Sequence, residues 1–133
     1  MLSRVLDRLY VGGSSPDADG SPAFTDEALS EMGIRYVLNV GGVELKHLKR
    51  AYVYPVHLSD DGLNPGWVFS TALDKLASAL AQGKVLVTCR AGLSRSPFIV
   101  LLWLQRMGMS HDEAYRFLKE RHPATQINSE LLE

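Results

Sequence analysis

The sequence predicts a single α/β domain built on a central, mostly parallel, twisted sheet that helices flank. Two observations lead to this fold class. Short apolar runs rich in β-branched residues alternate along the chain with amphipathic stretches of helical period. The 133 residues are 46% hydrophobic and 22% charged, which supplies enough apolar material for one core and gives no reason to divide the chain.

The first half of the chain predicts two strands with a helix between them. Residues 8–11 form the first strand, and a polar segment at 14–22, rich in Gly, Ser, Pro and Asp, follows as a surface insertion. A helix is expected over residues 25–32, because acidic residues suit its first turn and Gly33 suits its end. Residues 36–40 then form the next strand.

The second half predicts the other elements of the sheet and its helical layers. Residues 52–58 form a strand, and Pro55 indicates a sheet edge or a strand end. Residues 67–82 form an amphipathic helix, in which Trp67 falls at core spacing. The remaining predicted elements are the strand 84–88 and the helices 97–107 and 111–121.

One segment between a strand and a helix carries the strongest signal. Residues 89–96 read CRAGLSRS, which places the only cysteine of the chain six positions ahead of Arg95. The backbone N–H groups of such a loop would point inward, and the N-terminus of the next helix adds positive potential. Gly92 lets the chain curl tightly, and Ser94 or Ser96 can cap the helix. The segment is therefore predicted to be a phosphate-binding loop between a central strand and a helix N-terminus.

Cys89 and Arg95 suggest a chemistry for this loop. The N–H donors and a neighbouring guanidinium favour the thiolate of Cys89, which would make it a nucleophile at neutral pH. The planar fork of Arg95 can hold two phosphoryl oxygens and stay with them through the transition state. A cysteine behind an apolar strand is more commonly an inert core residue. The spacing to Arg95, the glycine at 92 and the strand, loop and helix context together favour the nucleophile.

The residues around Cys89 also resemble those of a known protein family. Residues 87–97, VTCRAGLSRSP, resemble the active-site signature of the cysteine-dependent dual-specificity phosphatases, within the protein tyrosine phosphatase superfamily. The resemblance covers nearly the whole chain, so residues 1–133 are expected to form one catalytic domain of this kind. Thr88 departs from the family pattern, which has His before the cysteine, and Ile127 replaces the usual Pro before Asn128. The other segments that carry the resemblance are 9–13, 33–40 and 110–115.

The chemistry also needs a general acid on a separate element, since an alkoxide or phenolate must be protonated as it leaves. The acid loop, residues 59–65, reads SDDGLNP and supplies two carboxylates where the family's acid lies. Asp61 is the preferred acid, because it stands four residues before Pro65 as in many members. Asp60 is the alternative, which a gap-free comparison with some members would choose. One of the two is expected to cap a turn or the following helix instead.

The family mechanism assigns the remaining roles by resemblance. Cys89 takes the phosphoryl group while Asp61 protonates the leaving oxygen, and Asp61 then deprotonates the water that attacks the phosphocysteine. Ser96 hydrogen-bonds the sulfur and makes it a better leaving group. Thr88 and Asn39 support the loop. No metal and no organic cofactor is expected, because the loop itself stabilises the charge. The residues expected to bind the phosphate are Arg90, Ala91, Gly92, Leu93, Ser94 and Arg95.

Composition limits the partners and the location. A net charge of −1 gives no general affinity for nucleic acid or membranes. No run approaches eighteen apolar residues, no secretory signal is recognised, and one cysteine leaves no disulfide framework. A cytoplasmic protein is expected, with a phosphorylated protein or a small phosphomonoester as its substrate; the oligomeric state is left open. The four histidines show no metal-ligand spacing and are expected to be ordinary surface or loop residues: His47, His57, His111 and His122.

Three functions are compatible with these residues. The leading hypothesis is a phosphomonoester hydrolase of dual specificity, which acts on phosphotyrosine and on phosphoserine or phosphothreonine through a shallow, permissive pocket. The second applies the same chemistry to a nucleotide, a phosphoinositide or a glucan phosphate. The third is a weakly active, phosphate-binding pseudophosphatase, which Thr88 keeps open although Cys89 and Arg95 are intact. A sulfur-transfer domain of rhodanese type fits less well, because its loop lacks this Cys-to-Arg spacing.

Overall fold

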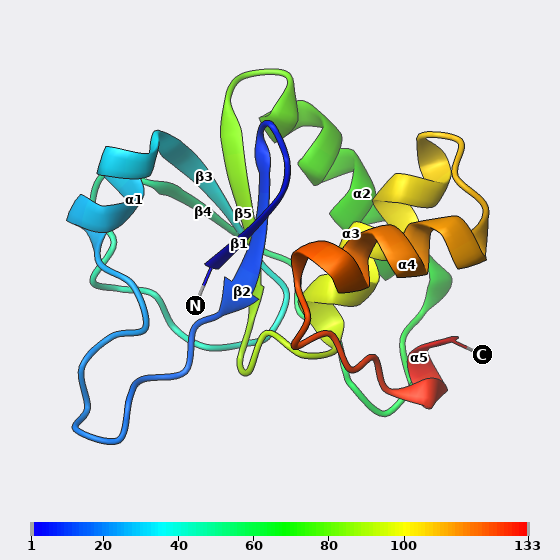
Figure 1. Cartoon of the computed structure of the whole chain (residues 1–133). Helices are drawn as coiled ribbons and strands as arrows, with labels where there is room; N and C mark the ends of the chain where they lie inside the picture. The colour runs from blue at the N-terminus through cyan, green and yellow to red at the C-terminus, as the bar shows by residue number, and fades with distance from the viewer. Residues whose placement is uncertain (1, 133) are drawn as a thin grey trace.

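The computed structural model describes residues 2–132, in which a five-stranded sheet carries helices on both faces (Figure 1). The strand order is β1-β2-β5-β3-β4; β1 and β2 are antiparallel, and every other neighbouring pair is parallel. The predicted class, a single α/β domain with a mostly parallel sheet, is confirmed. The strands are β1 (Leu2–Leu6), β2 (Leu9–Gly13), β3 (Ile34–Asn39), β4 (Tyr52–Pro55) and β5 (Lys84–Cys89). The helices are α1 (Asp26–Met32), α2 (Gly66–Leu80), α3 (Arg95–Arg106), α4 (His111–Arg121) and α5 (Ser129–Leu132).

The central strand β5 brings the predicted loop to the middle of one sheet edge. At its carboxyl end, Cys89 is paired with Gly13 of β2, and Thr88 is paired with Asn39 of β3. The carboxyl ends of these three parallel strands therefore lie level with one another. Ligands of open α/β sheets bind at such an edge, so the topology alone places residues 89–96 where a ligand is expected.

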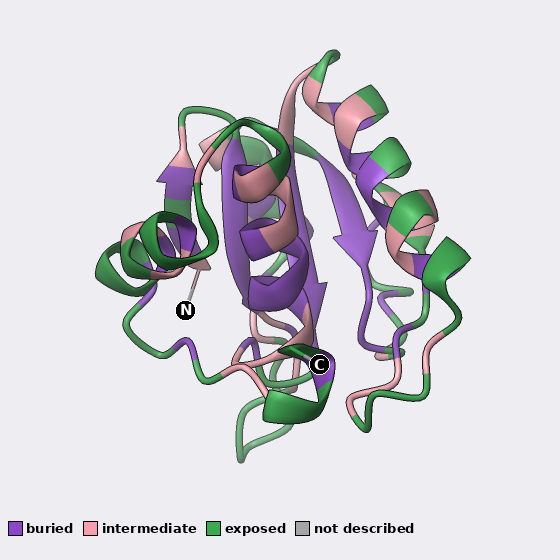
Figure 2. Cartoon of the chain, turned by 90° about the vertical axis from the view of Figure 1, so that its right-hand side faces the viewer, coloured by how far each residue is buried: buried purple, intermediate pink, exposed green. Residues whose placement is uncertain are grey.

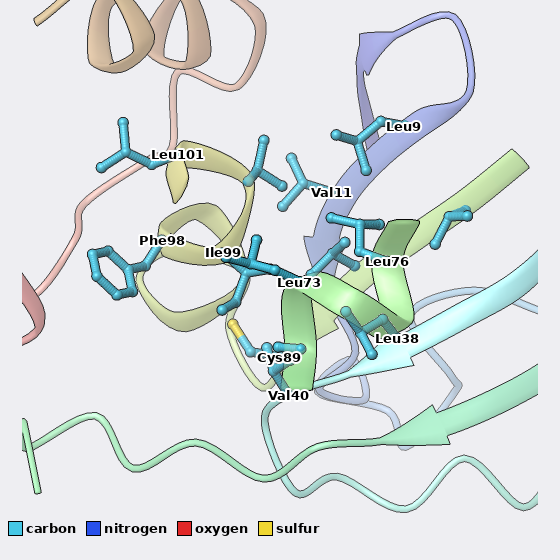
Figure 3. Close-up of a cluster of buried hydrophobic side chains, with 14 of the residues drawn as sticks. Leu9, Val11, Leu38, Val40, Leu73, Leu76, Cys89, Phe98, Ile99 and Leu101 are labelled. Carbon is cyan, nitrogen blue, oxygen red and sulfur yellow. The ribbon is translucent and has the colours of Figure 1, made fainter. Parts of the chain in front are cut away.

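The two faces of the sheet carry separate cores. Alternate residues of β5 point to opposite faces: Val85 and Val87 join the larger core with α2, α3 and α4, whereas Leu86 joins the smaller core with α1. Figure 2 shows buried residues along the strands and on the inner sides of the helices. Cys89 and Ile99 belong to the larger core, which anchors the base of the predicted loop (Figure 3).

Helix ends follow local sequence signals. Thr25 Oγ1 accepts a hydrogen bond from Ala28 N–H at 3.0 Å, and Gly33 ends α1 with a φ of 80°. A reciprocal capping box between Ser110 and Glu113 begins α4. Within residues 2–132, no helix combines the length and the apolar content that crossing a bilayer requires.

The sequence prediction omits two elements and places some ends differently. It omits β1, a strand of only five residues in which the buried positions include the polar Ser3, and α5, which has only four residues. The predicted strand at 52–58 is β4 up to Pro55, at the sheet edge that a proline tolerates. Beyond it, backbone hydrogen bonds from Val56 to Asn39 (2.9 Å) and from Leu58 to Val40 (3.1 Å) still hold the chain beside the end of β3.

The predicted core position of Trp67 is wrong. Its side chain is 68% exposed at the start of α2. The buried stripe of this helix begins one residue later, at Val68, and continues through Ala72, Leu73 and Leu76. One residue is a rotation of about 100° around a helix, which is enough to turn the indole away from the sheet.

Candidate active site

Residues 89–95 form the predicted phosphate-binding loop, in which several carbonyl groups bond to segments outside the loop. Cys89 O accepts a hydrogen bond from Ser14 N–H at 2.9 Å, and Leu93 O accepts one from Gln126 N–H at 2.7 Å. In a trans peptide the C=O and the N–H point in opposite directions, so these contacts turn the following N–H groups inward. Within residues 2–132, no backbone carbonyl accepts a hydrogen bond from the N–H groups of residues 90–94. They are available to an anion.

Glycines allow the neighbouring segments to press directly against this loop. Gly92 has a φ of 73°, and a Cβ there would lie 2.3 Å from the backbone N of Gly13. A Cβ on Gly41 would lie 2.4 Å from Cα of Cys89. Neither position has room for a side chain, so the chain leaving β2 and the chain leaving β3 both support the loop by close backbone contact.

Cys89 lies at the base of the loop beside a buried hydroxyl. The residue is 2% exposed, and its Sγ is 3.1 Å from Oγ of Ser96, which is fully buried. The guanidinium of Arg95 is fixed by a 3.1 Å hydrogen bond from Nη1 to Leu58 O. Helix α3 begins at Arg95, so its free N–H groups and the positive end of its dipole lie next to the loop. The sulfur therefore lies at the base of an electropositive cradle.

Thr88 and Asn39 contact the surroundings of the loop rather than its interior. Thr88 Oγ1 donates to Gly12 O at 2.8 Å and thus joins β5 to β2 just before the cysteine. Asn39 accepts from Gly41 N–H at 3.2 Å and donates to Val43 O at 2.5 Å. These two bonds fix the turn that presses on Cys89. Both residues therefore support the loop indirectly, by fixing the segments that pack against it.

A hollow of about 430 Å³ opens over the loop. Three segments of the chain line it: the acid loop, the phosphate-binding loop and the stretch before α5. The lining residues are Asp60, Cys89, Arg90, Ala91, Leu93, Ser94, Arg95, Gln126, Ile127 and Asn128. The predicted nucleophile, the predicted arginine and one of the two candidate acids therefore share one hollow.

The two candidate acids have different surroundings. Asp60 lines the hollow, and its Oδ1 accepts a 2.7 Å hydrogen bond from Ser94 Oγ. Asp61 is exposed, and its Oδ1 accepts from Ser59 Oγ at 2.5 Å and from Leu63 N–H at 3.0 Å. The Ser59 hydroxyl, and then the Leu63 N–H, hold the pKa of Asp61 below its usual value. Asp61 thus makes the turn contacts expected of one of the pair, whereas Asp60, the alternative acid, lines the hollow.

Ser94 and Asn128 connect the two loops, which sequence reasoning did not anticipate. Ser94 is the N-cap residue of α3, but its side chain makes no hydrogen bond to the helix, so the predicted capping is wrong for it. Its hydroxyl bonds Asp60 instead and accepts from Asn128 N–H at 2.8 Å. The side chain of Asn128 donates to Asp60 O at 2.8 Å. The only sequence signal for Asn128 was its place in the family pattern.

The histidine prediction fails at one position. His122 is 5% exposed, because the end of α4 carries it under β1 and against the phosphate-binding loop. His122 does lie in the loop after α4, as predicted, but the predicted surface position is wrong for it.

Comparison with known proteins identifies the class of this fold and site. Residues 19–133 match the family model described as "Dual specificity phosphatase, catalytic domain". The chain is 32% identical to human dual specificity protein phosphatase 8 over 98% of its own length and 21% of that protein. It is 34% identical to human dual specificity protein phosphatase 16 over 98% and 19% of the two chains. The crystal structure of human DUSP28 superposes with a TM-score of 0.82 at 24% identity, over 99% of this chain and 90% of that one.

The chain belongs to the dual specificity phosphatase family, whose catalytic domain is that of a cysteine-dependent phosphatase, a hydrolase. A domain of this class implies phosphorylated substrates. The chain spans about a fifth of the length of the two curated relatives named above.

Proposed function

We propose that this domain hydrolyses phosphate monoesters through a phosphocysteine intermediate, with phosphotyrosine and phosphoserine or phosphothreonine in proteins as its substrates. The observation that carries the proposal is the gathering of Cys89, Arg95 and Asp60 around one hollow. The reaction needs a nucleophile, a donor that can hold two phosphoryl oxygens, and an acid for the leaving group. The hollow offers one residue for each of these roles.

In the first step the Cys89 thiolate attacks phosphorus, so that an S–P bond forms and the ester P–O bond breaks. The guanidinium of Arg95 and the inward N–H groups hold the nonbridging oxygens and stabilise the charge that they carry in the transition state. The leaving oxygen takes a proton from the carboxyl group of Asp60. The products are the free alcohol or phenol and a phosphocysteine.

In the second step water attacks the phosphocysteine, and Asp60 takes a proton from that water. The S–P bond breaks, its electron pair returns to sulfur, and inorganic phosphate leaves. The Ser96 hydroxyl, 3.1 Å from Sγ, donates a hydrogen bond that stabilises the departing thiolate. The enzyme returns to its starting state with no other reactant than water.

We assign the acid role to Asp60 rather than Asp61. A general acid must reach the leaving oxygen, and Asp60 lines the hollow that contains Cys89. The hydrogen bonds that lower the pKa of Asp61 also disfavour the protonated form that a general acid needs. Asp61 instead stabilises the turn of the acid loop.

Two exposed apolar side chains, one on the acid loop and one at the start of α2, favour a protein substrate. Leu63 on the acid loop is 80% exposed, and Trp67, four residues further along the chain, is 68% exposed. Apolar groups so close to Asp60 in the chain suit the residues that flank a phosphorylated side chain. The proposed location is the cytoplasm, where reducing conditions preserve the Cys89 thiol.

We also propose that residues 1–133 act as one catalytic unit. The family match begins at residue 19, yet β2 and Ser14 precede it. β2 pairs with the strand that carries Cys89, and Ser14 holds the carbonyl of Cys89. Removal of these residues is therefore expected to disrupt the loop.

Substrate panels test the proposal. Purified protein should hydrolyse para-nitrophenyl phosphate and then phosphotyrosine and phosphothreonine peptides, with higher kcat/KM for peptides than for nucleotides or phosphoinositides. Cys89→Ser is the control for contaminating phosphatases. Failure to turn over any of these substrates would sink the proposed activity, whereas a preference for nucleotides or phosphoinositides would replace the protein substrate and keep the chemistry.

A further inference from the structure

His122 joins the first strand of the sheet to the phosphate-binding loop. Its ring Nε2 is 2.7 Å from Gly92 O, and its ring Nδ1 is 2.6 Å from Oγ of Ser3 in β1. His122 is 5% exposed and Ser3 is 9% exposed. His122 is outside the set of residues that line the active-site hollow, so any effect on the reaction must pass through the loop.

The partners of the ring define which nitrogen carries the proton. Gly92 O is a carbonyl oxygen and can only accept, so His122 Nε2 must donate to it. In the neutral ring Nδ1 then has a lone pair, and the Ser3 hydroxyl donates to it. Hydrogen bonds therefore run from Ser3 through His122 to Gly92. Each polar atom of the ring has a partner, so its orientation is fixed.

Hydrogen bonds of the His122 backbone also limit the positions that its ring can take. His122 N–H donates to Leu118 O at 2.8 Å, at the end of α4. Its carbonyl accepts from Thr125 N–H at 2.9 Å and from Thr125 Oγ1 at 2.6 Å. Such contacts on both sides of the residue leave the imidazole little freedom to move away from the loop.

The bond to Gly92 O sets the direction of one inward N–H group. The carbonyl of Gly92 and the N–H of Leu93 belong to the same peptide plane and point in opposite directions. While His122 holds the carbonyl outward, the N–H of Leu93 points into the loop. A rotated peptide would turn the carbonyl dipole toward the bound anion and remove one donor from it.

Among the described residues, the hydrogen bond to the Gly92 carbonyl comes from a side chain and not from a backbone N–H group. The carbonyls of Arg90 and Leu93 are bound by the backbone N–H groups of Ser15 and Gln126, whose positions follow from the fold. Gly92 has the backbone freedom of a glycine, with a φ of 73°, and its carbonyl is bound by an imidazole. Loss of the imidazole would therefore leave the Gly92 carbonyl without its hydrogen bond.

We propose that His122, oriented by Ser3, is a positioning residue that keeps the Gly92–Leu93 peptide turned with its N–H toward the substrate phosphate. The inference rests on the proposed phosphatase function. It predicts that loss of the His122 donor weakens phosphate binding and slows the reaction while Cys89, Arg95 and Asp60 remain in place.

Two substitutions of similar polarity test whether the Nε2 donor, rather than the rest of the His122 ring, is what matters. In His122→Gln the amide nitrogen can occupy the place of Nε2 and still donate to Gly92 O. In His122→Asn the shorter amide reaches only the place of Nδ1 and leaves Gly92 O without that donor. Ser3→Ala removes the group that orients the ring. Tyr36→Phe is the control, because it removes a 2.9 Å hydrogen bond to Gln82 at the opposite end of the sheet.

The measurements are kcat and KM, the inhibition constant of inorganic phosphate, and the protection of Cys89 by phosphate against iodoacetate. We expect His122→Asn to lower kcat/KM by about 10- to 100-fold, the usual effect of losing a group that orients an active-site residue. Its inhibition constant for phosphate should rise about 10-fold, the scale of one lost donor of about 1.4 kcal/mol. His122→Gln should keep most of the wild-type kcat/KM and an inhibition constant for phosphate near the wild-type value. Ser3→Ala should change both quantities in the same direction as His122→Asn, but by less.

A purely structural role predicts a different pattern. His122→Asn would then melt at a lower temperature, like Tyr36→Phe, with phosphate inhibition and kcat/KM unchanged, and that outcome overturns the proposal. If His122→Asn fails to fold, Ser3→Ala decides, because an unchanged inhibition constant there also overturns it. The alkylation assay needs no turnover. If the wild-type protein is protected by phosphate but hydrolyses nothing, the proposed function fails while the role of His122 is still measured.

Discussion

The hydroxyl of Ser94 donates a 2.7 Å hydrogen bond to Oδ1 of Asp60, so the phosphate-binding loop itself holds the carboxyl group of the acid loop. Asn128 reinforces the pair through its backbone N–H to Ser94 Oγ and its side chain to Asp60 O. Three short bonds thus place the proposed acid relative to the nucleophile's loop. The folded site itself therefore fixes the position of Asp60.

Asp60→Asn is expected to lower kcat for a phosphotyrosine peptide by about 10²- to 10⁴-fold, the usual contribution of a positioned acid or base. The loss should be smaller for para-nitrophenyl phosphate, because its leaving group needs less protonation. Asp61→Asn is the matched control and should change kcat little, since that carboxyl is exposed and bonds only within its own loop. Steady-state rates on the two substrates measure this difference.

The pH dependence of kcat gives a second measurement of the same assignment. A general acid works in its protonated form, so general-acid catalysis gives kcat a limb that falls on the alkaline side. Asp60→Asn should flatten that limb, and Asp61→Asn should leave it in place. The opposite ranking of the two variants would return the acid role to Asp61.

Cys89→Ser is expected to abolish turnover and to retain phosphate-ester binding. A serine hydroxyl is not ionised near neutral pH, whereas the loop N–H groups and Arg95 that bind the phosphate remain. Calorimetry with a phosphopeptide should give a dissociation constant near the KM of the wild-type protein. Measurable steady-state hydrolysis by this variant would exclude the phosphocysteine mechanism.

The proximity of Cys89 and Arg95 could be predicted from sequence because their relation is local. Cys89, Arg95 and Ser96 lie within eight consecutive residues, so a strand, a tight loop and a helix are enough to bring them together. The mostly parallel character of the sheet could also be predicted, because apolar β-branched runs that alternate with helices favour parallel strands.

The features that the sequence left open or missed depend on contacts between distant segments. Asp60 and Asp61 are neighbours with the same side chain, and contacts from Ser94 and Asn128, 34 and 68 residues from Asp60, give Asp60 surroundings that Asp61 does not share. His122 is hydrogen-bonded to Ser3, 119 residues away, on a strand that the sequence pattern did not reveal. Such pairs are set by tertiary packing, and neither local period nor composition carries a signal for them.

Thr88→Val is expected to destabilise the fold by about 1–3 kcal/mol, the usual cost when a buried hydrogen-bond partner is removed. Thr88 is fully buried, and its hydroxyl donates to Gly12 O at 2.8 Å. Thr88→Ser keeps the donor and should lose less stability. Urea unfolding of the three proteins, compared at equal m-values, checks the order. Equal stability of Thr88→Val and the wild-type protein would mean that this bond contributes nothing.

Asp26→Asn is expected to lower stability near neutral pH and to have a smaller effect in acid. Burial alone would raise the pKa of Asp26, but hydrogen bonds from the backbone N–H groups of Lys49 and Arg50 outweigh it and hold that pKa below its usual value. The contribution is therefore fully present above the unfolded-state pKa of about 3.9 and is lost as pH falls through the lower folded value. Unfolding free energies of both proteins from pH 7 to pH 3 should converge toward the acid end. A difference that stays constant over this range would show that shape, rather than the charge of the carboxylate, explains the effect of the substitution.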